Sequence, residues 1–169
     1  MLNEIEKRQS IRKYKNKMVE NEKIEILLRA AMNAPSARNT QEWKFIVITQ
    51  KKALSDITKL SPYTQFVKSA PCAILVIADL NKAINKEYGM INCSAAIENM
   101  LIEAVHQGLG TCWCGIAPNE DRIVGFQRNF NLKDFEYPVG LVAIGYSDQE
   151  KPLSDYFRSE VVRYIKEDE

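Results

Sequence analysis

Histidine is almost absent from this sequence, since His106 is the only one in 169 residues. A serine–histidine–aspartate triad or a histidine-based metal site therefore has almost nothing to be built from. No activated nucleophile and no pair of catalytic carboxylates stands out either. These absences exclude much hydrolase chemistry, and His106 is expected to serve only as a partner for the end of a helix.

Long apolar stretches are missing as well. The longest, Cys72 to Ala78, is far shorter than the roughly 18 to 20 residues that a membrane span requires, and Met1 to Glu6 contains no apolar signal core. An excess of one charge is also lacking, because 23 Lys and Arg residues face 22 Asp and Glu residues, for a net charge of +1. We therefore expect a soluble cytoplasmic protein with no nucleic acid and no membrane among its partners.

The few cysteines show no pattern of a secreted or zinc-binding protein. Cys72, Cys93, Cys112 and Cys114 are expected to be reduced, and their spacings fit no usual zinc framework, so no metal site is expected. The pair Cys112 and Cys114 is not Cys-x-x-Cys, and strand alternation places both on one face with Trp113 on the other. Packing is therefore favoured over a catalytic disulfide.

Apolar periodicity predicts a single domain, 1–169, of strands separated by helical segments. Strands are expected at 45–48, 72–78, 109–115 and 137–146, and helices at 21–33, 51–60, 87–107 and 119–127. Asn21 and Asn119 are expected as N-caps and Gly108 as a left-handed helix end, while Asn99 is expected to bond only locally. The pattern indicates an α+β or three-layer fold around one mixed sheet, with the helix at 87–107 at a subunit interface.

A run of six basic residues without an acid extends from Lys7 to Lys17. Within it, Arg8 and Arg12 flank Ser10, and two guanidiniums beside a hydroxyl suit a phosphate. A solvated basic face is the alternative. The glycine fingerprints of dinucleotide and P-loop sites are both absent, so a bound phosphate would have to be held by side chains.

Four stretches in sequence order resemble the nitroreductase family of FMN-dependent oxidoreductases. Each is a weak motif alone, but their order is specific, and together they cover nearly the whole chain: Arg8 to Tyr14, Ala34 to Trp43, Gly108 to Gly115, and Gly140 to Tyr146 followed by Lys151 to Leu153. The resemblance implies a central, mixed but mostly antiparallel sheet flanked by helices, in an intertwined homodimer with the flavin at the subunit interface. It also implies that residues 147–169 form an arm that docks on the partner subunit.

The same resemblance implies a set of cofactor-binding residues. Arg8, Gln9 and Ser10 would hold the phosphate and ribityl end, and Arg12 would stabilise the N1 and O2 edge of reduced flavin. Backbone near Cys114 and Gly115 would face N5, and Gln65 would lie toward the pyrimidine side. The other subunit would supply the loop that contains Pro35, Ser36, Ala37 and Asn39, and Lys151 would add charge at the phosphate.

Two departures from the family pattern stand out. The family often places two basic residues just before its C-terminal Pro or Leu, whereas here Gln149 and Glu150 precede Lys151. FMN affinity is therefore expected to be weaker and more sensitive to salt. The chain also lacks room for a long helical insertion over the flavin, so a lid would be short, at 118–133, or absent.

The resemblance implies that the chemistry resides in the flavin and that no side chain is catalytic. NADH or NADPH would give hydride to flavin N5, and a small electron acceptor such as a nitroaromatic or a quinone would then be reduced by a ping-pong mechanism. The alternatives are a flavin-binding or interaction module with little turnover, a flavoenzyme of this fold with a different dedicated substrate, and an anion-binding protein without flavin.

Overall fold

The computed structural model describes residues 1–150 and 152–165. In chain order, its elements are α1 (Asn3–Lys7), α2 (Asn21–Met32), η1 (Ala37–Asn39), β1 (Trp43–Ile48), α3 (Lys51–Ile57), η2 (Pro62–Thr64), η3 (Val67–Ser69), β2 (Cys72–Asp79), α4 (Lys86–His106), β3 (Gly110–Gly115), α5 (Glu120–Phe130), β4 (Glu136–Gly145) and η4 (Ser159–Val161). Within these residues, no helix has the length and apolar character needed to cross a membrane.

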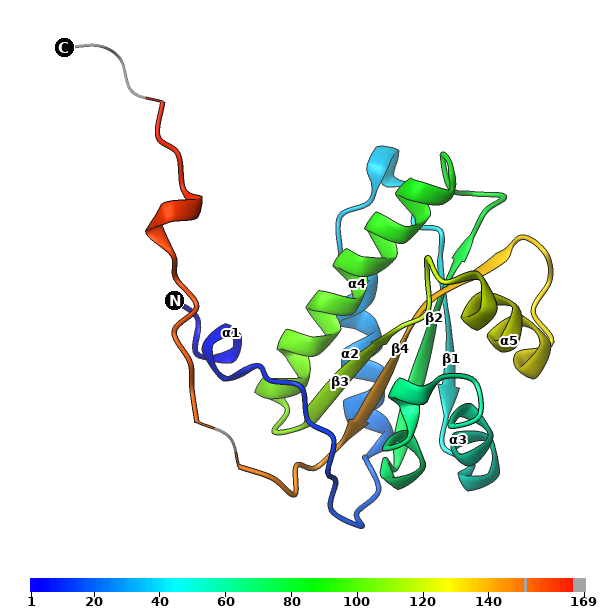
Figure 1. The fold of residues 1–169 in the computed structure, drawn as a ribbon, viewed down its shortest axis with the longest axis horizontal. Helices are drawn as coiled ribbons and strands as arrows, with labels where there is room; N and C mark the ends of the chain where they lie inside the picture. The colour runs from blue at the N-terminus through cyan, green and yellow to red at the C-terminus, as the bar shows by residue number, and fades with distance from the viewer. Residues whose placement is uncertain (151, 166–169) are drawn as a thin grey trace.

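The four strands form one sheet in the order β1-β2-β4-β3, and every neighbouring pair is antiparallel. An isolated bridge between Ser10 and Thr111 adds a parallel pairing at the β3 edge. Figure 1 shows α2 and α4 on one side of the sheet and α3 and α5 on the other. The central strand β2 is buried along its whole length because helices cover both of its faces. The predicted α+β fold with a mostly antiparallel sheet is confirmed.

The long helix α4 packs against the sheet and against α2. Its buried face includes Ile97, Met100 and Ala104. Asn99 does not bond only locally, as the sequence predicts, because its Nδ2 donates to the Ala30 carbonyl of α2 at 3.1 Å. Ile91 is 62% exposed on the same helix, and the placement of α4 at a subunit interface stays a prediction.

Most of the predicted helix ends are confirmed. Asn119 caps α5 by accepting a hydrogen bond from the Arg122 N–H, and Gly108 has a left-handed φ of 72° after α4. The predicted cap at Asn21 is wrong, because Glu20 occupies the N-cap position in extended geometry. The Glu20 carboxylate caps no helix N–H and instead accepts a hydrogen bond of 2.6 Å from the Tyr146 hydroxyl.

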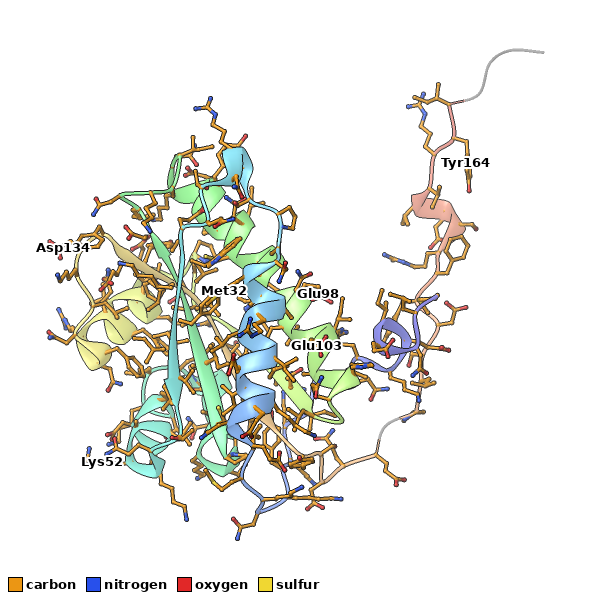
Figure 2. All side chains as sticks on the ribbon, turned by 180° about the vertical axis from the view of Figure 1, so that it is seen from behind. Met32, Lys52, Glu98, Glu103, Asp134 and Tyr164 are labelled. Carbon is orange, nitrogen blue, oxygen red and sulfur yellow. The ribbon has the colours of Figure 1, made fainter. Side chains whose placement is uncertain are left out.

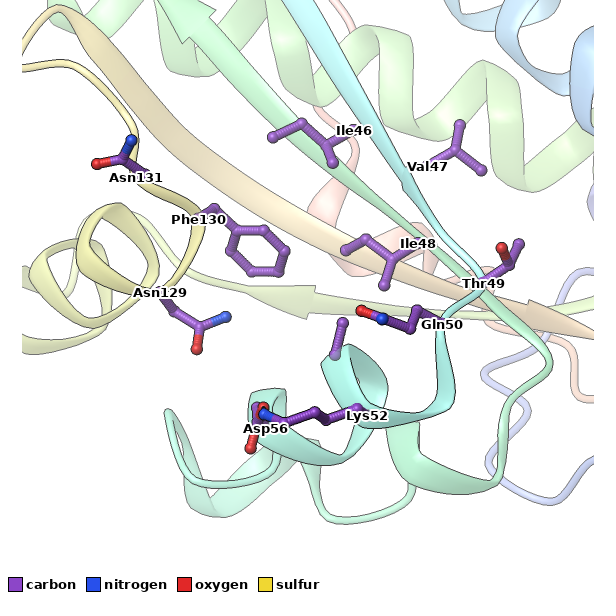
Figure 3. Close-up of a pocket in the computed structure, with 11 residues that line it drawn as sticks. Ile46, Val47, Ile48, Thr49, Gln50, Lys52, Asp56, Asn129, Phe130 and Asn131 are labelled. Carbon is purple, nitrogen blue, oxygen red and sulfur yellow. The ribbon is translucent and has the colours of Figure 1, made fainter.

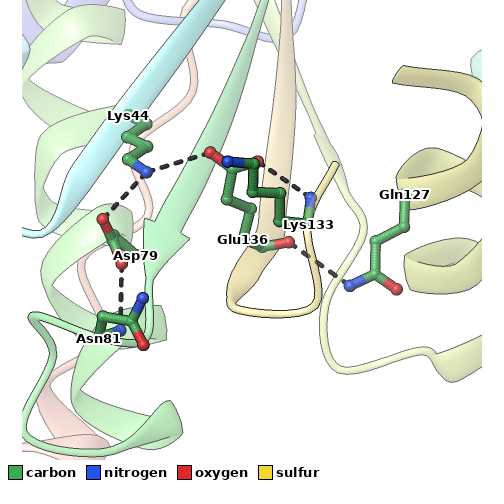
Figure 4. Close-up of polar contacts among 6 residues, drawn as sticks. All are labelled: Lys44, Asp79, Asn81, Gln127, Lys133 and Glu136. Atoms are coloured by element: carbon green, nitrogen blue, oxygen red, sulfur yellow. Dashed lines mark hydrogen bonds and ion pairs between the residues drawn. The ribbon is translucent and has the colours of Figure 1, made fainter. Parts of the chain in front are cut away.

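An ion cluster joins β1, β2 and β4 at one end of the sheet (Figure 4). Lys44 Nζ lies 3.0 Å from Asp79 Oδ2 and 3.0 Å from Glu136 Oε1. Burial acts to raise the pKa of Asp79, but the Lys44 ammonium and the Asn81 N–H outweigh it, so the net pKa is lowered. The Lys133 N–H and the Lys44 ammonium lower the pKa of Glu136.

Residues 146–149 after β4 remain hydrogen-bonded to residues 12–15, and the chain from 152 onward extends away from the sheet (Figure 1). Figure 1 shows this tail running past α1, and in Figure 2 Tyr164 lies well away from Glu98 and Glu103 on α4. The large apolar side chains between 153 and 165 are 42–90% exposed: Leu153, Tyr156, Phe157, Val161, Val162, Tyr164 and Ile165. Docking of the 147–169 arm on a partner stays a prediction, and its last four residues lie outside the described ranges.

Candidate functional site

The basic segment 8–14 is fixed against the β3 edge of the sheet. The Ile11 N–H donates to the Thr111 carbonyl at 2.8 Å, next to the parallel bridge between Ser10 and Thr111. Ile11 also lies so close to Gly110 that a Cβ there would be 2.7 Å from Ile11 Cγ1. The absence of a side chain at Gly110 therefore lets the segment lie flat on the strand.

Gln149 binds the same segment from the C-terminal side. Its Oε1 accepts hydrogen bonds from the backbone N–H groups of Arg12, at 2.9 Å, and Lys13, at 3.0 Å. Neither Lys nor Arg could do this, because their side chains carry donors and no acceptor. Gln149, which stands where the family often has a basic residue, therefore holds the basic segment in place by hydrogen bonds. The sequence analysis missed this role.

Arg8, Gln9 and Ser10 line a cavity of about 340 Å³, here called the Arg8 cavity, and their binding of a phosphate stays a prediction. Its other wall is the tail, with Pro152, Ser154 and Tyr156, and the Gln9 amide donates to the Pro152 carbonyl at 2.9 Å. Arg8 Nε lies 3.9 Å from Glu98 Oε1, and both side chains are partly exposed. An exposed ion pair of that length contributes little, so Glu98 competes weakly with an anion at Arg8.

Arg12 lines a second cavity, of about 180 Å³, here called the Arg12 cavity. Cys114 and Gly115 line it too, so the structure brings these three predicted residues together. The remaining lining residues are Ser61, Tyr63, Phe66, Cys112, Trp113 and Arg122. The Arg12 guanidinium lies 5.9 Å from the centroid of the Phe66 ring, within cation–π range.

Cys112 and Cys114 alternate with Trp113 as predicted. Their exposed fractions are 2% and 7%, against 37% for Trp113. A hydrogen bond with Cys112 and then burial raise the pKa of the Cys114 thiol far above its ordinary value. Burial raises the pKa of Cys72 to about 12. These thiols stay protonated at neutral pH, which disfavours thiolate chemistry.

Arg122 and Tyr63 belong to the Arg12 cavity although the sequence analysis did not single them out. Arg122 Nη1 donates to the Gly115 carbonyl at 3.0 Å, and its guanidinium lies 5.0 Å from the centroid of the Tyr63 ring. Arg122 is in the first turn of α5, where the helix dipole disfavours a cation. A cation at this unfavourable position is the signal by which the sequence could have identified Arg122.

The predicted loop residues Pro35, Ser36, Ala37 and Asn39 lie elsewhere. The Ala37 N–H donates to Asn92 Oδ1 at 3.2 Å, whereas Arg8 approaches Glu98. Six residues of α-helix correspond to about 600°, or 240° after one full turn, so these contacts are on different sides of α4. In Figure 1, η1 lies near the start of α4 and α1 near its end. The structure does not bring this loop to the Arg8 cavity of its own chain.

Two more predicted residues are not placed at the cavities. Gln65 hydrogen-bonds within its own region, with Nε2 2.6 Å from the Thr58 carbonyl, so its place beside a flavin stays a prediction. Lys151 lies outside the described residues.

Two cavities larger than the Arg8 cavity lie along the edge strand β1, away from the basic segment. They measure about 540 and 560 Å³. Figure 3 shows the Phe130 ring and the side chains of Ile46 and Ile48 converging on one of them. They are grooves beside the outer edge of β1, and a lysine lines each, Lys52 in one and Lys44 in the other.

Comparison with known proteins identifies relatives in the nitroreductase family. The model of the nitroreductase family matches residues 5–146. A protein of Methanothermobacter thermautotrophicus, provisionally named NADH dehydrogenase/NAD(P)H nitroreductase, is 36% identical over 157 residues, which are 93% of this chain and 82% of that protein.

Solved structures agree with the sequence comparisons. A Clostridium acetobutylicum structure, provisionally named NADH oxidase, has a TM-score of 0.93 and 40% identity over 97% of this chain and 99% of its own. The FMN-dependent nitroreductase of Clostridium difficile R20291 has a TM-score of 0.91 and 29% identity over 98% and 99% of the two chains.

Proposed function

Because the chain belongs to the nitroreductase family, we propose that it is an FMN-dependent oxidoreductase that uses NADH or NADPH to reduce a small electron acceptor. The observation that supports this most strongly is the pair of neighbouring cavities on the basic segment, one at Arg8 and the other at Arg12. Arg8 and Arg12 are four positions apart in the chain, so their Cα atoms are at most about 14 Å apart. Such a site suits an elongated molecule with an anion at one end and a ring at the other.

The residues present fit FMN chemically. The phosphate carries about −1.5 to −2 charges, and the Arg8 cavity offers a guanidinium, the Gln9 amide and the Ser10 hydroxyl. The Arg12 cavity combines a second guanidinium with the aromatic side chains of Tyr63, Phe66 and Trp113. The first group is suited to bind the phosphate and the second to orient the ring and to balance negative charge on it.

When bound, FMN would supply the redox chemistry, accepting hydride at N5 from NADH or NADPH and, in a separate ping-pong half-reaction, reducing a nitroaromatic or a quinone. The protein contributes binding, orientation and charge, and no side chain has to act as acid, base or nucleophile. The raised pKa values of the buried Cys72 and Cys114 thiols support this division.

A homodimer would account for two features of the single chain: the position of the Pro35–Asn39 loop and the exposed apolar tail. The Pro35–Asn39 loop contacts a different side of α4 from Arg8, so a second copy would have to bring its loop to the flavin. The tail would dock on that second copy, because seven large apolar side chains are too many to leave in water.

Steady-state oxidation of NADH and NADPH, with and without a quinone, tests the proposal. An FMN-loaded protein should show quinone-dependent oxidation and parallel double-reciprocal lines, as a ping-pong mechanism requires. Binding of FMN without turnover by either nucleotide would instead support the binding-module alternative.

A further inference from the structure

The loop between α2 and β1 has an unusual backbone. Arg38, Asn39 and Gln41 have φ values of 54°, 56° and 45°. Side-chain-bearing residues rarely adopt this left-handed region, and such conformations persist only where surrounding contacts impose them. Three within four residues, none a glycine, therefore require an anchor.

The anchor is a buried carboxylate at the end of the loop. Glu42 is 0% exposed. Its Oε2 accepts a hydrogen bond of 2.7 Å from the Thr40 hydroxyl, and its Oε1 accepts one of 2.8 Å from the Asn92 amide. Over the described ranges, no Lys, Arg or His pairs with it. Neutral donors alone thus hold the carboxylate, so the loss of either leaves a buried acceptor poorly satisfied.

Asn92 connects this carboxylate directly to the loop. Its Oδ1 accepts from the Ala37 N–H at 3.2 Å while its Nδ2 donates to Glu42. Asn92 is 4% exposed on α4. One buried amide therefore fixes the middle of the loop through its oxygen and the end of the loop through its nitrogen.

Close packing of α4 on the sheet makes the contact possible. Gly89, about one turn before Asn92, lies against Ala78 of β2, where a Cβ would come within 3.0 Å of the Ala78 Cβ. The Glu42 carbonyl also accepts from the Asp79 N–H at 2.8 Å. Glu42 is thus held by its backbone on β2 and by its side chain on α4.

From this network we infer that Glu42 and Asn92 are positioning residues, which hold the Pro35–Asn39 loop in the one shape that completes the flavin site of a second copy of this chain. The inference rests on the proposed function. Glu42 is fully buried and acts on the cofactor only through the loop. A merely stabilising role would lower the melting temperature without a specific loss of FMN affinity.

Substitutions at Glu42 separate geometry from charge. In Glu42→Gln, the new amide nitrogen can donate to the Thr40 hydroxyl, whose proton then goes to the Ala37 carbonyl, 3.0 Å away. The new amide oxygen can still accept from Asn92. Glu42→Gln therefore keeps the network, whereas Glu42→Ala removes both acceptors. Thr40 can still donate to the Ala37 carbonyl, but the buried Asn92 amide loses its acceptor.

The test compares Glu42→Ala, Glu42→Gln and Asn92→Ala with Asn99→Ala in the full-length protein. Asn99→Ala is the matched control, because it removes an amide of the same type from the same helix but breaks a bond to Ala30. The readouts are the melting temperature of the apoprotein, the FMN dissociation constant and hydrogen exchange of the backbone amides at 36–41.

We expect Glu42→Ala and Asn92→Ala to raise the FMN dissociation constant about tenfold and to accelerate exchange at 36–41 by a similar factor. Asn99→Ala and Glu42→Gln should stay within about twofold of the wild type in both. Two results would overturn the inference. One is unchanged hydrogen exchange at 36–41 in Glu42→Ala. The other is that Glu42→Ala binds FMN as tightly as Asn99→Ala does when both variants have lost the same amount in melting temperature.

Failure of the proposed function would look different. If the wild type binds no FMN, that function and the flavin role of the loop both fall, whereas the exchange data still decide whether Glu42 and Asn92 anchor the loop.

Discussion

Replacement of Gly110 by alanine should destabilise the protein and weaken its flavin site together. A Cβ at this position would lie 2.7 Å from Ile11 Cγ1 and 2.9 Å from both Ile11 Cβ and Ile11 Cγ2. Because the Cβ of Ile11 is itself too close, a side-chain rotation cannot relieve the contact, and the segment must move off β3. Overpacking of this kind costs about 1–3 kcal/mol. Loss of the hydrogen bond from Ile11 to Thr111 adds about 1 kcal/mol.

We therefore expect Gly110→Ala to lose about 2–4 kcal/mol in urea unfolding. FMN affinity, measured by quenching of flavin fluorescence, should fall at least about tenfold, because the moved segment carries Arg8 and Arg12. The control is Gly125→Ala in α5, where a Cβ would make an ordinary contact of 3.7 Å with Leu60. Its better helix propensity should stabilise the protein by about 0.8–1 kcal/mol. If Gly110→Ala unfolds within about 0.5 kcal/mol of the wild type, the account of how Ile11 packs is wrong.

Three further results are expected. Arg12→Ala should weaken FMN binding or lower the flavin reduction potential, whereas the control Lys13→Ala should change neither. If both values are unchanged in Arg12→Ala, Arg12 does not have the role proposed for it. The buried cysteines should resist a thiol reagent at pH 8 in the native apoprotein and all react after unfolding, so rapid native labelling would contradict their burial. Asp79 and Glu136 have lowered pKa values in the folded protein. The stability that they contribute is therefore present above their ordinary pKa values of 3.8 and 4.5, and it is lost as the pH falls through their pKa values in the folded state. Urea midpoints at pH 7 and pH 3 should differ less in Lys44→Met than in the wild type, and an equal difference would contradict this.

The elements with strong local signals could be predicted from the sequence. The continuous apolar run from Cys72 identified the central strand, and Asn119 and Gly108 marked helix ends that the structure confirms. The resemblance placed Arg12 near Cys114 and Gly115, and the structure brings these three residues to one cavity. Their contact with a flavin stays a prediction.

What could not be predicted depends on contacts between distant parts of the chain. Gln149 was interpreted as a lost cation, yet its oxygen binds backbone groups 136 and 137 residues away in sequence. Asn99 and Glu42 depend similarly on partners 69 and 50 residues away. A polar side chain in a sequence shows its donors and acceptors but not which distant groups the topology brings to it.

A dimer of this chain should bind one FMN per subunit. The most direct test is the visible spectrum of the purified protein after incubation with FMN and removal of the excess, together with its mass in solution. We expect a flavin band that corresponds to about one FMN per chain, and the mass of two chains. A protein that stays colourless, or that binds FMN fully as a monomer, would contradict it.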